Sequence, residues 1–296
     1  MKHDHLCARI RKLFATLVSA LVPQKELRHK VRDLLHPYNA QRTIAYFQKE
    51  YVCKLQFPDM YAETEQEGPF FSPYIWQCWL QGTEQAPDVV RRCLRSVEVY
   101  KEAGQQVILL TEDNISDYLE LPPYILEKRR KGIIPDAQFS DILRVYLLDK
   151  YGGLWIDATC LLTSSIPEWV YRQPFFVFQS AGEFAYTQIQ SCFLYSSRSS
   201  WLLKAWKEIL DSYWKNEDSM MHYFQLHLMF VALVTDNKYA KKCYATMKKV
   251  SEAPTKELYE LLSHPTCDAE KLKEISDRSF VHKLTYKTPL FFPESF

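Results

Sequence analysis

The sequence predicts an α/β domain in which helices flank a central sheet. Two aromatic and apolar runs, at residues 74–80 and 105–111, are typical of buried strands, and an amphipathic segment beginning at Asp88 separates them. Further along, residues 135–163 contain a helical stripe, a glycine pair and a short apolar strand. Strands and helices that alternate along a chain usually form a sheet covered by helices.

Composition narrows the class of protein. The chain has 296 residues, of which 47% are hydrophobic and 15% aromatic, and its formal net charge is +1. This length suits one large α/β domain, or a domain with an added subdomain. The near-neutral charge argues against a general polyanion binder, and no G-x-x-x-x-G-K phosphate loop or nucleic-acid motif occurs. We therefore expect no nucleic-acid partner.

The eight cysteines form no C-x-x-C pair, which argues against a zinc site. Several lie in apolar, strand-like runs, where cysteine behaves as a small hydrophobic residue. This usage is typical of a reducing compartment, so the sequence predicts a cytoplasmic protein.

A helical extension is expected over residues 1–60, ahead of a main domain at residues 70–296. Its first apolar run is shorter than the roughly 20 residues that span a bilayer. Two interpretations stay open: a basic amphipathic helix lying on the inner face of the plasma membrane, or a helix packed on its own domain. A second helix is predicted over residues 39–54, and residues 58–73 are predicted to be a linker. The stripe of the first helix consists of Leu6, Ile10, Leu13, Phe14, Leu17 and Leu21.

The centre of the main domain is a predicted helix–turn–strand unit. Apolar residues at helical spacing follow Pro135, and the glycine pair at 152–153 ends that helix, because glycine tolerates the left-handed backbone that helix ends often adopt. Residues 154–156 are bulky and apolar, which predicts a short buried strand ending at Asp157. A carboxylate at the carboxyl end of a buried strand lies where open α/β sheets bind ligands.

Beyond this unit, PFFVFQS and QIQSCFLYS are strand-like, and a helical insert is predicted over about residues 201–280. MHYFQLHLMFVALV within it is apolar nearly all round, which is typical of a buried helix. His222 and His227 lack the four-residue spacing of helical metal ligands, so a buried, hydrogen-bonded histidine is favoured over the alternative, a role at the acceptor site. The tail SFVHKLTYKT alternates like a strand.

Several segments resemble the signature of capsular-polysaccharide-synthesis glycosyltransferases, which belong with the sugar transferases that carry a D-x-D motif. The resemblance is carried by S-D-I-L-R at 140–144 and by L-L-x-K-Y-G-G-L-W-I-D-A-T at 147–159. I-W-Q-x-W-x-x-G at 75–82 and H-K-L-T-Y-K at 282–287 add to it. It implies a GT-A-like fold, a single nucleotide-sugar-binding domain whose mixed sheet is flanked by helices.

The resemblance also implies roles for the residues of the central unit. In such families the S-D-x-x-R helix lies beside the donor sugar, so Asp141 would accept hydrogen bonds from sugar hydroxyls and Arg144 would orient Asp141 or donate to the sugar. Asp157 would bind a metal ion and the donor diphosphate. Thr159 stands where the D-x-D motif has its second acid; it can add a hydroxyl ligand but no charge.

Residues outside the central unit are assigned by the same resemblance. Trp79, with Trp76 as the second choice, would face the nucleoside, and core packing is the alternative for both. Ser191 would lie beneath the donor sugar, unless it is an ordinary strand serine. In the tail, His282 would complete the metal site, while Lys287 and Lys283 would neutralise the departing phosphate.

The function implied is transfer of a sugar from a nucleotide-diphosphate donor, expected to be a UDP-sugar, to a saccharide or lipid-linked saccharide of a growing capsular or cell-surface polysaccharide. The expected cofactor is Mn²⁺ or Mg²⁺ at Asp157. No second carboxylate stands out as a general base, and together with the family resemblance this favours retention. The alternative is a catalytically idle relative that binds a nucleotide sugar or a partner enzyme. The reason for this alternative is the missing second acid of the D-x-D motif, where this chain has Thr159.

Overall fold

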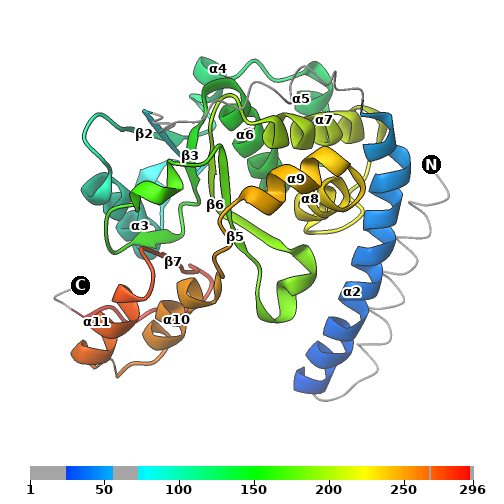
Figure 1. Ribbon diagram of the computed structural model, residues 1–296. Helices are drawn as coiled ribbons and strands as arrows, with labels where there is room; N and C mark the ends of the chain where they lie inside the picture. Colours follow the sequence, from blue (N-terminus) through cyan, green and yellow to red (C-terminus); the bar gives the residue numbers. More distant parts are fainter. Residues whose placement is uncertain (1–24, 56–72, 267, 294–296) are drawn as a thin grey trace.

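A computed structural model describes residues 25–55, 73–266 and 268–293 of the chain (Figure 1). The apolar stripe at residues 6–21 and most of the expected linker at 58–73 lie outside the described residues. Among those that are described, none of the helices combines the length and the hydrophobicity that a bilayer crossing requires.

A five-stranded mixed sheet with the strand order β2-β1-β3-β6-β5 forms the centre of the domain (Figure 1). β1 is parallel to β2 and β3, whereas β6 is antiparallel to β3 and β5. Helices flank this sheet, which confirms the predicted α/β class. The strands are β1 (Tyr74–Cys78), β2 (Gln106–Leu110), β3 (Gly153–Ile156), β5 (Phe175–Gln179) and β6 (Ile189–Ser196).

The first half of the domain follows the predicted strand–helix–strand order. α3 (Asp88–Tyr100) begins at the predicted residue and joins β1 to β2. Two short helices come next, α4 (Ile115–Tyr118) and α5 (Pro123–Arg130). Short 3₁₀ segments are η1 (Val52–Lys54), η3 (Thr83–Gln85), η4 (Glu168–Val170) and η5 (Gly182–Thr187).

Gly152 makes the turn from α6 (Asp136–Tyr151) directly into β3. Its φ of 71° lies in the left-handed region that glycine tolerates, and its N–H donates to the Leu148 carbonyl at 2.9 Å. A Cβ on Gly152 would lie 3.0 Å from the backbone nitrogen of Arg198. The turn therefore has no room for a side chain, and its tightness places the end of β3 close to α6.

The expected helical insert divides into two groups. α7 (Trp201–Asn216), α8 (Gln225–Asp236) and α9 (Lys238–Thr246) pack beside the main sheet, and every residue from 225 to 234 is buried. α10 (Ala253–Leu262) and α11 (Ala269–Asp277) lie apart from them, beside a small antiparallel sheet of β4 (Cys160–Leu162) and β7 (Val281–Lys283) (Figure 1).

The N-terminal helix α2 (Lys25–Glu50) begins earlier than the helix predicted over residues 39–54. Tyr46 and Phe47 near its end belong to the same hydrophobic core as α7 and α8. The buried carboxylate of Glu217 accepts hydrogen bonds from the hydroxyls of Tyr46 (2.5 Å) and Tyr51 (3.0 Å). The end of α2 is thus packed on the main domain.

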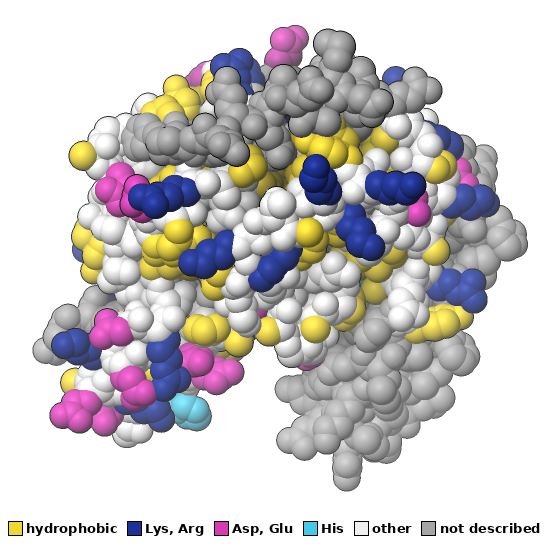
Figure 2. Space-filling model, viewed as in Figure 1, with side chains coloured by type: hydrophobic (Ala, Val, Ile, Leu, Met, Phe, Trp, Pro, Cys, Tyr) yellow, Lys and Arg dark blue, Asp and Glu magenta, His cyan; other side chains and the backbone are white. Residues whose placement is uncertain are grey.

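The near-neutral net charge is unevenly distributed. Figure 2 shows a band of Lys and Arg side chains across the middle of one face, over β5, α7 and α9. The exposed lysines of α9 and the segment after it are Lys238, Lys241, Lys242, Lys248 and Lys249.

Candidate functional site

Four charged side chains from three elements meet at the carboxyl end of β3. Asp141 and Arg144 come from α6, Asp157 follows β3, and Lys283 lies on β7. Arg144 Nη1 is 2.9 Å from Asp141 Oδ1, and its Nη2 is 3.0 Å from Asp157 Oδ1. Lys283 Nζ is 2.6 Å from Asp157 Oδ2. The four form a chain of alternating charge, which we call the charged cluster.

The main chain around Asp157 fixes its position. Its N–H donates to the Cys192 carbonyl of β6 at 2.8 Å, and its own carbonyl accepts from Cys160 N–H at 2.8 Å. The indole of Trp155 donates to Asp157 Oδ1 at 2.8 Å, and the guanidinium of Arg144 lies 5.1 Å from the Trp155 ring centroid. Trp155 therefore positions both Asp157 and Arg144. The sequence gave no signal of this role, because a tryptophan in a strand is usually a core residue.

Lys283 reaches the cluster because of strand pairing. β7 runs antiparallel to β4 with Lys283 opposite Cys160, three residues beyond Asp157. Its ammonium donates to Thr159 Oγ1 at 2.8 Å as well as to Asp157. The Leu284 N–H donates to the Thr159 carbonyl at 2.9 Å. The tail and the D-A-T motif are far apart in the sequence, but strand pairing and these hydrogen bonds hold them together.

A polar layer lies beneath Arg144. Its guanidinium donates to Ser191 Oγ, which lies 3.1 Å from His227 Nε2. Burial, with a further contribution from Arg144, lowers the pKa of His227 to about 3, so the imidazole is neutral. His227 is buried and hydrogen-bonded, as the favoured interpretation of the sequence expected, and the hydrogen bond to Ser191 connects it to the charged cluster. It lies in the apolar helix α8, whose periodicity did not predict that it contacts Ser191.

Burial and neighbouring charges shift the pKa values of the two carboxylates in opposite directions. Burial raises the pKa of Asp141 to about 6, although Arg144 partly opposes this. Burial also acts to raise the pKa of Asp157, but Lys283 and Arg144 outweigh it and hold that pKa below its ordinary value. Burial lowers the pKa of Lys283, but the negative charge of Asp157 raises it by more, so the net shift is upward. Lys283 and Asp157 therefore form a stable ion pair at neutral pH.

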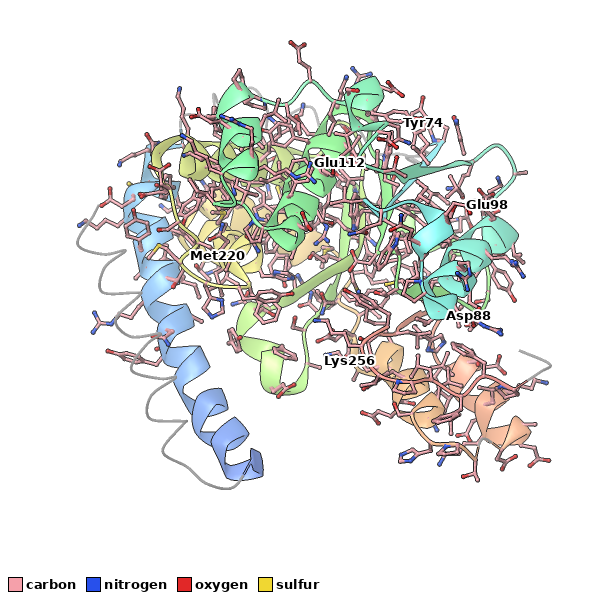
Figure 3. All side chains as sticks on the ribbon, turned by 180° about the vertical axis from the view of Figure 1, so that it is seen from behind. Tyr74, Asp88, Glu98, Glu112, Met220 and Lys256 are labelled. Carbon is pink, nitrogen blue, oxygen red and sulfur yellow. The ribbon has the colours of Figure 1, made fainter. Side chains whose placement is uncertain are left out.

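Gln138 links the charged cluster to the loop before α8. Its amide nitrogen is 3.3 Å from Asp141 Oδ2 and donates to the Tyr223 carbonyl at 2.9 Å. The Tyr223 side chain is 60% exposed. Figure 3 shows the side chains from behind, with Met220 of the segment before α8 and Lys256 of α10 labelled at separate places. Gln138 was not singled out from the sequence.

Six predicted site residues lie outside the charged cluster, and two of them, Ser191 and Thr159, are hydrogen-bonded to it. Trp76 is fully buried, donates to the Gly152 carbonyl and packs against Tyr74, Tyr118 and Tyr151, so it occupies the core, which was the alternative for this residue. Trp79 is partly exposed and meets the Tyr286 ring edge-on at 5.3 Å.

His282 precedes Lys283 on β7, so its side chain points to the opposite face of that strand. It is 0% exposed, and its Nε2 lies 3.3 Å from Thr163 Oγ1 and from the Ser276 carbonyl. The geometry does not bring His282 to Asp157. Lys287 is exposed, and its side chain makes no hydrogen bond or ion pair with any described residue.

The residues present do not fit the expected Mn²⁺ or Mg²⁺. Both oxygens of Asp157 already accept bonds from side chains, and the Thr159 hydroxyl accepts from Lys283. The third expected ligand, His282, lies on the other face of β7. Within the described part of the chain, no group of three or more His, Cys, Asp or Glu side chains could hold a metal ion. We assign no step to a metal.

The protein is an α/β protein whose charged cluster lies at the carboxyl end of a strand, the place where open α/β sheets bind ligands. The chain belongs to the capsular polysaccharide synthesis protein family, whose model matches residues 23–292. This confirms the family that the motifs predicted. A similar solved structure is "PaToxG Glycosyltransferase", with 13% identity and a TM-score of 0.40, covering 84% of this chain and 99% of that chain. No curated protein sequence matches significantly.

Proposed function

We propose that the protein is a GT-A-like glycosyltransferase that moves a sugar from a nucleotide-diphosphate sugar to a growing capsular or cell-surface polysaccharide. The observation that carries the proposal is the charged cluster, because two fixed cations and two carboxylates are what a sugar diphosphate requires. Membership of the capsular polysaccharide synthesis family supports the class of acceptor.

The two cations serve the leaving group. When the bond between the anomeric carbon and the diphosphate breaks, negative charge develops on the departing oxygen, and nearby cations stabilise it. Lys283 and Arg144 are already held in place by Asp157, at 2.6 Å and 3.0 Å. Because these groups need no rearrangement when charge develops, they stabilise the transition state more than mobile cations in water would.

Asp141 serves the sugar. It is buried, and Arg144 and Gln138 hold its two oxygens from different sides. A carboxylate fixed in this way accepts hydrogen bonds from sugar hydroxyls with a defined orientation. In the proposal Asp141 therefore selects and orients the donor sugar, and Ser191 supports it through Arg144.

Retention of the anomeric configuration is part of the proposal. An inverting transferase needs a carboxylate free to take the acceptor proton, and both carboxylates of the cluster are engaged by Arg144. In the retaining reaction, the acceptor oxygen bonds to the anomeric carbon from the side the diphosphate leaves. The bond from that carbon to the phosphate oxygen breaks, and the departing phosphate oxygen takes the acceptor proton.

The acceptor is proposed to bind beside Tyr223. The Tyr223 ring is exposed and meets the Phe224 ring edge-on, with 5.0 Å between the ring centroids. The Phe184 ring meets Phe224 at 5.3 Å. Exposed aromatic rings provide flat apolar surface for a sugar ring. Gln138 connects this aromatic loop to Asp141, which supports an acceptor position next to the donor sugar.

The test is release of nucleoside diphosphate from a panel of nucleotide sugars, with and without capsular oligosaccharide. The wild type should release nucleoside diphosphate from one donor class, and Arg144→Met should lose this activity by about 100-fold or more. Arg95→Met, an exposed arginine of α3, is the control and should behave as wild type. Binding of a nucleotide sugar without release from any donor would favour the catalytically idle alternative.

A further inference from the structure

We infer that the protein binds its nucleoside diphosphate without a divalent metal, because the ammonium of Lys283 occupies the position between Asp157 and Thr159 where a metal would bind. The inference rests on the proposed function and deepens it. It assigns to one lysine the role that the motif resemblance gives to a metal ion.

The distances place the ammonium between the two candidate ligands. Lys283 Nζ is 2.6 Å from Asp157 Oδ2 and 2.8 Å from Thr159 Oγ1. These are the first and third residues of D-A-T, the positions that hold the two acids of a D-x-D motif. A lysine ammonium has three N–H donors, and two are used here. With 28% of the side chain exposed, the third can reach a phosphate oxygen of a bound ligand.

The two carboxylates of the site are already balanced by two monovalent cations. Asp141 and Asp157 contribute two negative charges, and Arg144 and Lys283 contribute two positive ones. An acid at position 159 would add a third negative charge and call for a further cation, but Thr159 adds none. A divalent ion beside Asp157 would sit within a few ångströms of two cations, with no additional carboxylate to offset it.

The fold holds Lys283 in this position. β7 is paired with β4 in a register that sets Lys283 opposite Cys160, and the Leu284 N–H is bonded to the Thr159 carbonyl. Moving the ammonium away would leave Asp157 Oδ2 without the partner that it has at 2.6 Å. His282, the neighbouring residue on β7, points to the opposite face of the strand and does not replace Lys283 beside Asp157.

Binding measurements in chelator and in Mn²⁺ test the inference. Calorimetry with UDP, GDP and ADP should give, for the wild type, dissociation constants in EDTA and in Mn²⁺ that agree within about threefold. Lys283→Met should weaken binding about tenfold or more in both conditions, because a charge-assisted hydrogen bond to phosphate is lost. Lys271→Met, an exposed lysine of α11, is the matched control and should bind as wild type.

A second variant is designed to create the metal site. Thr159→Asp combined with Lys283→Ala provides two acids at D-x-D spacing and removes the ammonium. This double variant should bind Mn²⁺, seen as loss of the free Mn²⁺ signal in electron paramagnetic resonance, and should bind the nucleoside diphosphate only when Mn²⁺ is present. The wild type should leave the free Mn²⁺ signal unchanged.

The outcomes separate the two claims. Wild-type binding of a nucleoside diphosphate that requires Mn²⁺ would overturn the inference and leave the proposed function standing. Failure of all nucleoside diphosphates to bind, with and without Mn²⁺, would overturn the proposed function and the inference together. If Lys283→Met does not fold, the wild-type titrations in EDTA and Mn²⁺ still decide the question.

Discussion

Replacing Asp157 by Asn should reduce stability as well as activity. The carboxylate of Asp157 accepts hydrogen bonds from Arg144 Nη2 at 3.0 Å, Trp155 Nε1 at 2.8 Å and Lys283 Nζ at 2.6 Å. In Asp157→Asn the negative charge that compensates two cations is lost. The amide nitrogen would also meet one of these donors, so one hydrogen bond becomes a contact between two donors.

The size of the loss follows from burial. Removing one partner of a buried ion pair costs about 3–5 kcal/mol. The Asp157 side chain is 24% exposed, so water can still reach the site, and the expected loss is at the low end, about 3 kcal/mol. For a chain of this length each kcal/mol lowers the melting temperature by about 2–4 °C, which gives a fall of about 6–12 °C.

Thermal unfolding followed by circular dichroism at neutral pH measures this loss. Asp113→Asn, an exposed loop residue, is the control and should melt as wild type. UDP should recover part of the loss in Asp157→Asn, since its phosphates supply the missing negative charge and ligand binding stabilises the folded state. A melting temperature within about 2 °C of wild type would refute the reasoning, because the two cations would then not depend on Asp157.

Three further predictions concern separate parts of the structure. Burial raises the pKa of Asp141 to about 6 from an ordinary 3.8, so its contribution to stability is complete below about pH 4 and is lost as the pH rises through 6. Chemical denaturation across this range should show a loss of about 3 kcal/mol that is absent in Asp141→Asn. Glu217→Ala should cost about 3 kcal/mol, because Tyr46 and Tyr51 lose their shared acceptor, while activity per folded molecule stays unchanged. Tyr223→Ala should raise the KM for the acceptor about tenfold and leave donor hydrolysis as in wild type.

Elements that depend on local pattern could be predicted from the sequence. The start of α3 at Asp88, the end of α6 at the glycine pair and the buried strand β3 all follow from hydrophobic periodicity and from the backbone freedom of glycine. The same patterns carry the family resemblance, so the family could be predicted as well. Asp141, Arg144 and Asp157 lie in this one continuous segment, which explains why sequence analysis grouped them.

Contacts that depend on strand register could not be predicted. His282 and Lys283 are neighbours in the tail motif, and alternation along a strand sends their side chains to opposite faces. Only the pairing of β7 with β4 shows that Lys283 is the one facing Asp157. The partners of His227 and Gln138 could not be predicted for a related reason, since they come from other elements.

Trp76 and Trp79 show a similar limit. Both are aromatic residues near the end of one strand, and nothing in the local sequence says which is covered. The tyrosines that cover Trp76, Tyr118 and Tyr151, come from later helices. Burial by residues that are distant in the sequence depends on the tertiary fold, so local periodicity does not predict it.

A crystal structure of the protein with a bound UDP-sugar, grown in the presence of chelator, tests the central claim most directly. The account predicts diphosphate oxygens within about 3.2 Å of Lys283 Nζ and of the Arg144 guanidinium, with sugar hydroxyls bonded to Asp141. A nucleotide sugar bound away from the carboxyl end of β3, or one whose diphosphate contacts neither Lys283 nor Arg144, would contradict it.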